Sequence, residues 1–276
     1  MADFGEYLPV DCVLRDGDPA LLHNRWPVMW ARLNREAVEE FGDPEVFFFT
    51  RSGYLGIQEY APCMWNGDQH TDWTRDYGMP CVMPASFSLG FSGVTMVHSD
   101  MGGFFSFGKL RRNAELLLRW TELCAFTPLM RSHESIRPER NVQPYAPEVV
   151  AQVAALTRLH AALGPYFAHV LRAAEEGVPV MRPDFYHGDY SCHRDDYSFF
   201  TGEDLFVSPV IRPGEKKHVL SLPEGEWAHL LTGRTYPGGE LTVEAPLGLP
   251  AVFYRTGSGF AGLFRAAADE YMKGRS

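Results

Sequence analysis

Charged and polar side chains recur directly after the short apolar runs in the first half of the sequence. Eight residues hold such positions: Asp3, Glu6, Arg51, Asp68, His98, Asp100, Arg131 and His133. In a β/α barrel the reactive groups sit where strands end and loops begin, at the carboxyl-terminal face. Charges that recur at strand ends are harder to explain by packing than any single charge, so the sequence predicts a polar pocket built from these residues.

Two residues of this set, Asp3 and Asp68, have side chains with a known joint chemistry. Across a pocket, one carboxylate can attack the anomeric carbon of a sugar while the other donates a proton to the leaving oxygen. The proton donor must stay protonated at neutral pH, which requires apolar or negatively charged surroundings that raise its pKa. Trp65 and Phe104 are close in sequence to the acids Asp68 and Asp100, and aromatic rings stack on sugar faces. The residue types therefore favour glycoside chemistry.

The elements that would position this pocket alternate between strand and helix. The apolar runs at 46–50, 63–67, 94–99 and 126–130 are predicted to be buried strands. One helix is predicted to begin at Asp18 and Pro19, an N-cap followed by a helix-starting proline, and to end near Phe41. Another is predicted to begin at Ser106 and to bury one face, made of Leu110, Ala114, Leu117, Thr121 and Cys124. Strand then helix, repeated, is typical of a parallel sheet or barrel.

The second half has shorter segments punctuated by glycine and proline. Two helices, at about 147–163 and 165–176, are predicted to be broken at Gly164 and Pro165. From Gly177 onward, strands are predicted at 205–210, 218–222, 226–231, 240–243 and 251–255. Turn signals separate them at 213–216, 222–225 and 236–239. This pattern predicts a small antiparallel β-domain.

Composition narrows the function classes. The 276 residues include 25 basic and 35 acidic side chains, for a net charge of −10, which disfavours binding to nucleic acid or to anionic lipid. The five cysteines show no CxxC spacing, which argues against a disulfide framework or structural zinc and indicates a reducing compartment. No run approaches a membrane span, and the first residues resemble no targeting segment. A cytoplasmic location is expected.

Other chemistries find little support in the sequence. GxSxG, HExxH, P-loop and strand-to-helix GxGxxG motifs are absent. A cluster between His187 and Asp196 has metal-binding residue types, but its spacing matches no known motif, so a polar surface loop is expected. Simpler explanations also stay open for three site candidates: Asp68 as a helix cap, Asp100 as a turn former and His133 in a surface salt-bridge cluster.

Several segments carry a resemblance to a known family. They are ADFGEYLP (2–9), MWNGDQHTDW (64–73), HSDMGGF (98–104), LLLRWTELCAFTPLMRSHE (116–134) and the later PVMRPDF and FVSPVIRPGEK. Their consistent order over nearly the whole chain resembles glycoside hydrolase family 31, the α-glucosidase and α-xylosidase family. Within it the sequence is most similar to the sulfoquinovosidases.

The resemblance implies a role for each candidate. Asp3 matches the nucleophile that forms a covalent glycosyl-enzyme intermediate, and Asp68 matches the general acid/base of the same retaining mechanism. The predicted substrate-binding residues are Glu6, Arg51, Trp65, Asp100, Phe104 and His133. The family uses no metal ion and no organic cofactor. The implied reaction is hydrolysis of α-sulfoquinovosides. Phe104 stands where sulfoquinovosidases typically have tyrosine, so an α-glucosidase or α-xylosidase is the alternative.

The resemblance also implies the architecture. The family's nucleophile ends the fourth barrel strand, whereas here it is residue three. We therefore expect residues 1–176 to form the C-terminal half of a (β/α)8 TIM barrel, strands four to eight. An antiparallel β-sandwich domain at 177–264 and a tail at 265–276 would follow. A missing N-terminal half or a homo-oligomer is then an expected partner, and a non-catalytic or partner-dependent fragment is the alternative to an autonomous enzyme, as is a silent carbohydrate-binding module.

Overall fold

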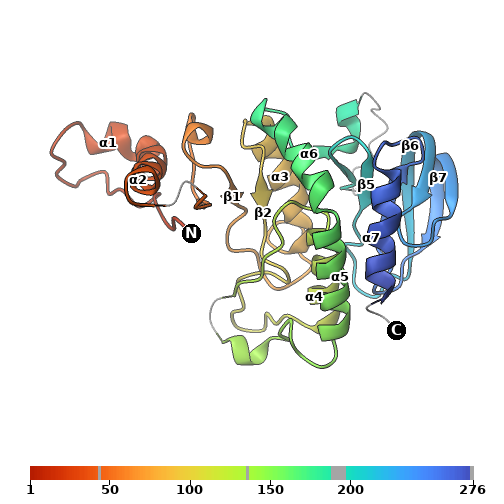
Figure 1. Ribbon diagram of the computed structural model, residues 1–276. Coiled ribbons are helices and arrows are strands. Elements are labelled where there is room, and N and C mark those ends of the chain that lie inside the picture. The colour runs from red at the N-terminus through yellow and green to blue at the C-terminus, as the bar shows by residue number, and fades with distance from the viewer. Residues whose placement is uncertain (43–44, 135–136, 188–196, 274–276) are drawn as a thin grey trace.

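The computed structural model describes residues 1–42, 45–134, 137–187 and 197–273 (Figure 1). The helices are α1 (Pro19–Leu22), α2 (Trp26–Phe41), α3 (Val82–Phe91), α4 (Ala114–Cys124), α5 (Val150–Ala162), α6 (Gly164–Glu175) and α7 (Ala261–Lys273). The strands are β1 (Met64–Trp65), β2 (Val97–His98), β3 (Met181–Pro183), β4 (Phe199–Thr201), β5 (Leu205–Ser208), β6 (Lys217–His229), β7 (Thr235–Glu244) and β8 (Ala251–Arg255). An α/β part is thus followed by an antiparallel sheet.

Parallel pairing orders the first part. Strands β1 and β2 pair in parallel, with Trp65 opposite His98. Single parallel bridges continue the order on both sides, from Ala2 to Thr50, from Thr50 to Met64, and from Asp100 to Arg131. Five segments therefore lie side by side in chain order, as expected for successive β/α units. The strand predicted at 46–50 is reduced to one bridging residue, Thr50. The run predicted at 126–130 contains no bridge, and the pairing falls on the next residue, Arg131.

The predicted core run at 46–50 is only partly buried. Phe48 is buried, but Phe47 is 48% exposed. The run pairs through few backbone bonds: Ala2 N–H donates to Phe49 O over 2.8 Å, and Thr50 N–H donates to Cys63 O over 3.2 Å. Alternation of side chains along an extended segment places neighbouring rings on opposite faces, so a run of three phenylalanines cannot bury all of them on one face.

Two helices of this part, α1 and α4, begin at side-chain caps. Asp18 caps α1 by accepting a hydrogen bond from Ala20 N–H, and a 3₁₀ turn, His23–Arg25, joins α1 to α2. The helix predicted to begin at Ser106 begins instead at Ala114, because Asn113 accepts from Leu116 N–H and caps it. Asparagine is as good an N-cap as serine, and the hydroxyl of Ser106 bonds elsewhere. Helices α5 and α6 meet at Gly164, as predicted.

The second part is one six-stranded sheet in the order β3-β4-β5-β8-β6-β7, antiparallel throughout. The turn predicted at 222–225 is not a turn, because β6 runs through it with a register shift between Leu222 and Glu226. The turn predicted at 236–239 likewise lies within β7. A bulge accommodates extra residues in a strand without ending it, which is why turn-forming residues misled the prediction. Strands β3 and β4 were not predicted.

The segment predicted as a tail differs most. Residues 261–273 form α7, which packs against α5 and lies beside the large sheet in Figure 1. Phe264, Ala267 and Tyr271 of α7 are completely buried, so the end of the described chain belongs to the core. Among the described residues no helix has both the length and the apolar character needed to cross a bilayer.

Candidate active site

The predicted site residues follow the parallel segments at their carboxyl ends. Asp3 comes after the bridging Ala2, Arg51 after Thr50, and Asp100 after β2. Parallel strands end at one edge of a sheet, so their loops meet there. The structure joins most of the candidates into three contacting groups, whereas Asp68, among the described residues, interacts with its neighbours only through charge.

The first group is centred on Arg51. Its guanidinium lies 2.5 Å from Glu6 Oε1 and 3.4 Å from Asp3 Oδ1, and it stands 4.2 Å from the centre of the Phe4 ring. Burial alone would raise the pKa of Glu6, but the hydrogen bond and charge of Arg51 lower it below its ordinary value. One cation therefore serves two neighbouring carboxyl groups, and Asp3 remains 40% exposed and reachable.

The backbone next to Asp3 is strained. Phe4 has a φ of 63°, in the left-handed region that a bulky residue seldom adopts. Phe4 N–H donates to Asp3 Oδ1 over 2.9 Å, and Ser52 Oγ–H donates to Phe4 O over 2.7 Å. These bonds hold the turn that orients the Asp3 side chain. Strain of this kind concentrates at functional sites.

Asp68 stands in a different electrostatic setting. Burial raises the pKa of its carboxyl, the charges of Asp3 and Glu6 raise it further, and Arg51 and His133 oppose the rise. Asp68 is thus close enough to Asp3 for the two charges to interact, and it favours the protonated form more than a free aspartate does. Among the described contacts, Asp68 caps no helix, which removes the simpler explanation for it.

The second group joins Asp100 and Arg131. Asp100 is fully buried, and Arg131 Nη1 donates to its Oδ1 over 2.6 Å. Burial raises the pKa of Asp100 to about 7, although Arg131 and the nearby Trp65 indole lower it. Its Oδ2 and Trp65 Nε1 are buried with no well-formed hydrogen bond among the described residues. The Trp65 indole nevertheless lies near the Asp100 carboxyl, because it contributes to lowering the pKa of that group.

His98 contacts Arg131 of this group. Burial and the charge of Arg131 lower the pKa of His98 to about 3, so its imidazole is neutral. Arg131 Nη1 lies 3.4 Å from His98 Nε2, and Cys63 Sγ lies 3.5 Å from Nδ1. A neutral ring that accepts at Nε2 carries its proton on Nδ1. His98 therefore positions Arg131.

The third group is an aromatic wall. The Phe104 ring meets Trp65 edge-on at 5.4 Å and stacks on His133 at 5.2 Å between centroids. Burial and Arg131 lower the pKa of His133, so this ring is largely neutral at pH 7. His133 is thus part of the pocket wall, and the surface salt-bridge explanation does not hold for it.

Two residues that shape the site were not predicted to have a catalytic or substrate-binding role. Arg131 and His98 stood at strand ends but were not among the predicted catalytic or substrate-binding residues. The position of both residues after an apolar run was the signal that could have identified them. The pairing of Arg131 with Asp100 depends on two loops 31 residues apart, which no local pattern reveals.

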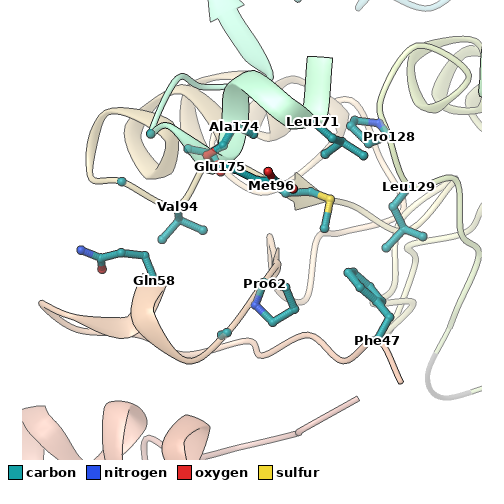
Figure 2. A pocket seen from close by; sticks show the side chains of 14 residues that line it. Phe47, Gln58, Pro62, Val94, Met96, Pro128, Leu129, Leu171, Ala174 and Glu175 are labelled. Carbon is teal, nitrogen blue, oxygen red and sulfur yellow. Dashed lines mark hydrogen bonds between the residues drawn. The ribbon is translucent and has the colours of Figure 1, made fainter. Parts of the chain in front are cut away.

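The large apolar cavity lies elsewhere. A cavity of about 710 Å³ opens at the amino ends of the parallel segments, where Figure 2 shows Phe47, Val94, Met96 and Leu129 around it. Glu175 is its one titratable lining residue, and none of the predicted site residues lines it. It offers no constellation for acid–base chemistry, so the charged groups above remain the candidate site.

Metal binding has no support in the part of the chain that the structure describes, where no group of three or more histidine, cysteine, aspartate or glutamate side chains could hold an ion. The cluster between His187 and Asp196 lies, for residues 188–196, outside the described residues.

Comparisons with known proteins match most of the chain to one family. Residues 8–170 match the "Glycosyl hydrolases family 31 TIM-barrel domain" and residues 177–258 match the "Glycosyl hydrolase family 31 C-terminal domain". Asp3 and Glu6 precede the first matched range. The chain is 45% identical to the sulfoquinovosidases of Escherichia coli K12 and Agrobacterium fabrum C58, over 96% of its length in both cases.

The structural comparison gives the same result. A solved "GH31 family sulfoquinovosidase from E. rectale in complex with aza-sugar inhibitor IFGSQ" matches 98% of this chain with a TM-score of 0.90 and 40% identity. The chain spans 40% and 41% of the two sulfoquinovosidases and 41% of the solved chain. The similarity therefore concerns about two fifths of each relative.

Proposed function

The chain belongs to glycosyl hydrolase family 31, and from this premise we propose that it is a retaining α-glycosidase that releases sulfoquinovose from α-sulfoquinovosides. The observation that carries the proposal is the contrast between two interacting carboxyl groups. Asp3 lies beside the guanidinium of Arg51, whereas burial and neighbouring negative charge raise the pKa of Asp68. Pairs of acids whose surroundings differ in this way divide the roles of nucleophile and proton donor.

The proposed reaction has two steps. Asp3 attacks the anomeric carbon and forms a glycosyl ester while Asp68 donates its proton to the departing glycosidic oxygen. Asp68, now a carboxylate, then takes a proton from water, whose oxygen attacks the same carbon and releases Asp3. Two displacements at one carbon retain the anomeric configuration.

The other residues of the site would bind the sugar. The wall of Trp65, Phe104 and His133 suits an apolar sugar face. Asp100 and Trp65, which stand next to this wall, would bind sugar hydroxyls. Glu6 would hold the guanidinium of Arg51 in place beside Asp3 and the sugar ring.

At the level of the fold, we propose that residues 1–176 form strands four to eight of a (β/α)8 barrel and that the antiparallel β-domain begins at residue 177 and precedes α7. The five parallel segments at Ala2, Thr50, β1, β2 and Arg131 support the first assignment, because they adjoin in chain order. The match to a barrel-domain family model at 8–170 supports it as well.

The test is hydrolysis of 4-nitrophenyl α-sulfoquinovoside, followed by proton NMR of the first-formed anomer. Wild type should release the α-anomer first, and Asp3→Asn should lower kcat by about 10³-fold or more. Asp68→Asn should lose more rate with an alkyl aglycone than with nitrophenol, because a good leaving group needs less protonation. Asp269→Asn, at an exposed position on α7, is the matched control.

Rates that Asp3→Asn and Asp68→Asn leave unchanged would contradict the proposal. The alternative α-glucosidase or α-xylosidase activity is favoured by Phe104, whose ring has no hydroxyl to contribute to sulfonate binding. Comparison of kcat/KM for nitrophenyl sulfoquinovoside, glucoside and xyloside decides among them. A folded chain that binds methyl α-sulfoquinovoside but cleaves none of these substrates would be a binding module.

A further inference from the structure

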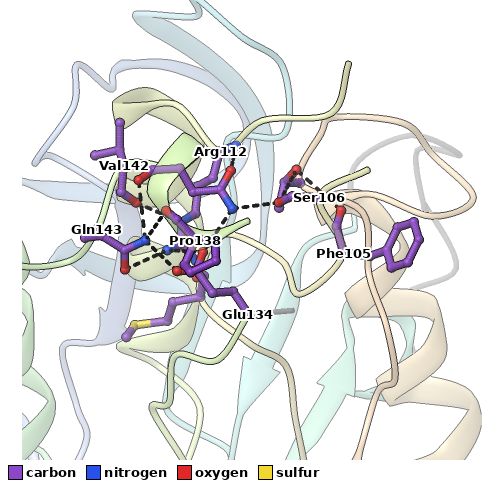
Figure 3. Close-up of polar contacts among 10 residues, drawn as sticks. Phe105, Ser106, Arg112, Glu134, Pro138, Val142 and Gln143 are labelled. Carbon is purple, nitrogen blue, oxygen red and sulfur yellow. Dashed lines mark hydrogen bonds and ion pairs between the residues drawn. The ribbon is translucent and has the colours of Figure 1, made fainter. Parts of the chain in front are cut away.

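A buried ion pair lies behind the proposed sugar pocket, between residues that the reaction above does not use. Arg112 Nη2 stands 2.9 Å from Glu134 Oε2, and only 1% of the Arg112 side chain is exposed. Figure 3 shows that the pair forms the centre of a polar network. A buried charge pair is costly to assemble and seldom adds net stability, so its presence beside a site calls for a reason.

Arg112 contacts the loop that carries Asp100. Its Nη1 donates to Met101 O over 3.3 Å, which is the carbonyl directly after Asp100. Its stem packs against the next residue so tightly that a Cβ added to Gly102 would lie 2.1 Å from Arg112 Cδ. The guanidinium thus fixes the backbone between Asp100 and Phe104.

Glu134 is the other half of the pair and directly follows His133. Its Oε2 accepts from Arg112 Nη2 and, over 3.0 Å, from Asn141 Nδ2. Its Oε1 accepts from Gln143 Nε2. Both carboxylate oxygens therefore accept from protein groups, and because Glu134 directly follows His133, these bonds tie the backbone of His133 to Arg112.

The network extends to the loop that carries Asp68. Asn141 Nδ2 donates to Ser106 Oγ over 2.7 Å, and Ser106 Oγ–H donates to Thr71 Oγ1 over 3.2 Å. The same two loops pair through their backbones, where Phe104 N–H donates to Gln69 O over 2.9 Å. Three pocket loops, around Asp68, Asp100 and His133, thus share one buried set of bonds.

We infer that the Arg112–Glu134 ion pair is a positioning device that sets Asp100 and His133 at a fixed separation for the sugar, which neither Arg112 nor Glu134 touches. The inference rests on the proposed glycosidase function. Arg112 and Glu134 are positioning residues, so their loss should weaken binding of the sugar more than it slows the chemical step.

The chain offers a matched control. Arg119 and Glu122 form a second buried pair with the same 2.9 Å separation and side-chain exposures of 1% and 5%. Arg119 bonds to Glu215 O and Ala245 O, in the antiparallel part, and not to the pocket loops. Breaking this pair tests the cost of any buried ion pair, without the pocket.

The experiment compares Arg112→Met and Glu134→Gln with Arg119→Met and Glu122→Gln in the full chain. We expect the first two variants to raise KM for 4-nitrophenyl α-sulfoquinovoside about tenfold with kcat within about threefold. They should also speed amide hydrogen exchange at Met101 and Phe104 about tenfold relative to the rest of the chain. The control variants should lower the melting temperature and change neither readout. Glu134→Gln is nearly isosteric and serves if Arg112→Met does not fold.

Site variants that lose stability as the controls do, with KM and the exchange of these two amides unchanged, would overturn the inference. If the wild-type chain cleaves no substrate, the proposed function fails while the exchange measurement still decides whether the pair orders the loops. Local exchange at wild-type rates in the Arg112 and Glu134 variants would then refute the positioning role.

Discussion

At the scale of single residues, the main feature of this site is that it buries charged groups. Asp100 is fully buried beside Arg131, and His98 behind them is held neutral. The residue types of the site could be predicted from the sequence, because each follows an apolar run. Their partners could not, since the Asp100–Arg131 and Phe104–His133 contacts depend on how separate loops meet.

The buried Asp100 should make stability depend on pH in a defined direction. Burial raises its pKa to about 7, whereas an aspartate in an unfolded chain titrates near 4. Between these values the native state binds more protons than the unfolded state, so the free energy of unfolding falls as pH rises from about 4 to 7. Above pH 7 the full free-energy cost of burying the Asp100 charge lowers the stability.

Urea unfolding at pH 5 and pH 7.5 measures this effect. Asp100→Asn should reduce the loss of unfolding free energy between the two pH values, because asparagine does not titrate. The matched variant Asp269→Asn, on the exposed face of α7, should keep the wild-type difference. Equal pH differences in all three proteins would show that Asp100 does not titrate in this range.

At the scale of elements, the differences from prediction share one cause. Ser106 could cap a helix, but its hydroxyl is used by Thr71 and Asn141, and Asn113 takes the cap. The glycine- and proline-rich stretches in β6 and β7 could form turns, but pairing with neighbours keeps them extended around a bulge. Local sequence signals correctly identified residues that can cap helices or form turns. Tertiary contacts then determined where the helices and strands begin and end.

Helix α4 should depend on its buried clamp to the antiparallel part. Arg119 donates to two carbonyls there, and Glu122 Oε1 accepts from Gly248 N–H over 2.6 Å. Removing one charged partner leaves the other buried without compensation, so Arg119→Met should cost about 3 kcal/mol of unfolding free energy in urea.

The double variant Arg119→Met/Glu122→Met tests the reason for this cost. Because no isolated charge remains in it, it should recover part of the lost stability. Losses that simply add would indicate that the carbonyl contacts, and not the charges, dominate.

At the scale of the whole molecule, the final helix joins the two parts. Helix α7 packs on α5 and on β8, and Tyr271 Oη–H donates to Gly248 O. The sequence predicts an α/β section followed by an antiparallel one, but the prediction of a tail at 265–276 is wrong, because α7 occupies most of it. Its large apolar residues are separated by alanines, which is a weak signal for a buried helix. Only the surface against which the helix packs determines that it is buried.

Truncating one side chain of α7 should therefore weaken the whole fold. Phe264 is completely buried between aromatic neighbours Tyr166 and Tyr254, and Phe264→Ala should cost about 3 to 5 kcal/mol of unfolding free energy. Differential scanning calorimetry measures the loss. Met272→Ala, at an exposed position on the same helix, should change stability by less than about 0.5 kcal/mol. Similar losses for both would place α7 outside the core.

The contact between Gly102 and Arg112 has a consequence for mutational libraries. Position 102 is restricted twice: by a φ of 83°, which disfavours most side chains, and by the arginine stem that any Cβ would strike. Shortening Arg112 removes only the second restriction. In a saturation library that varies both codons, asparagine, which tolerates a positive φ, should survive at 102 only in clones with a small residue at 112. Arginine clones should retain glycine alone.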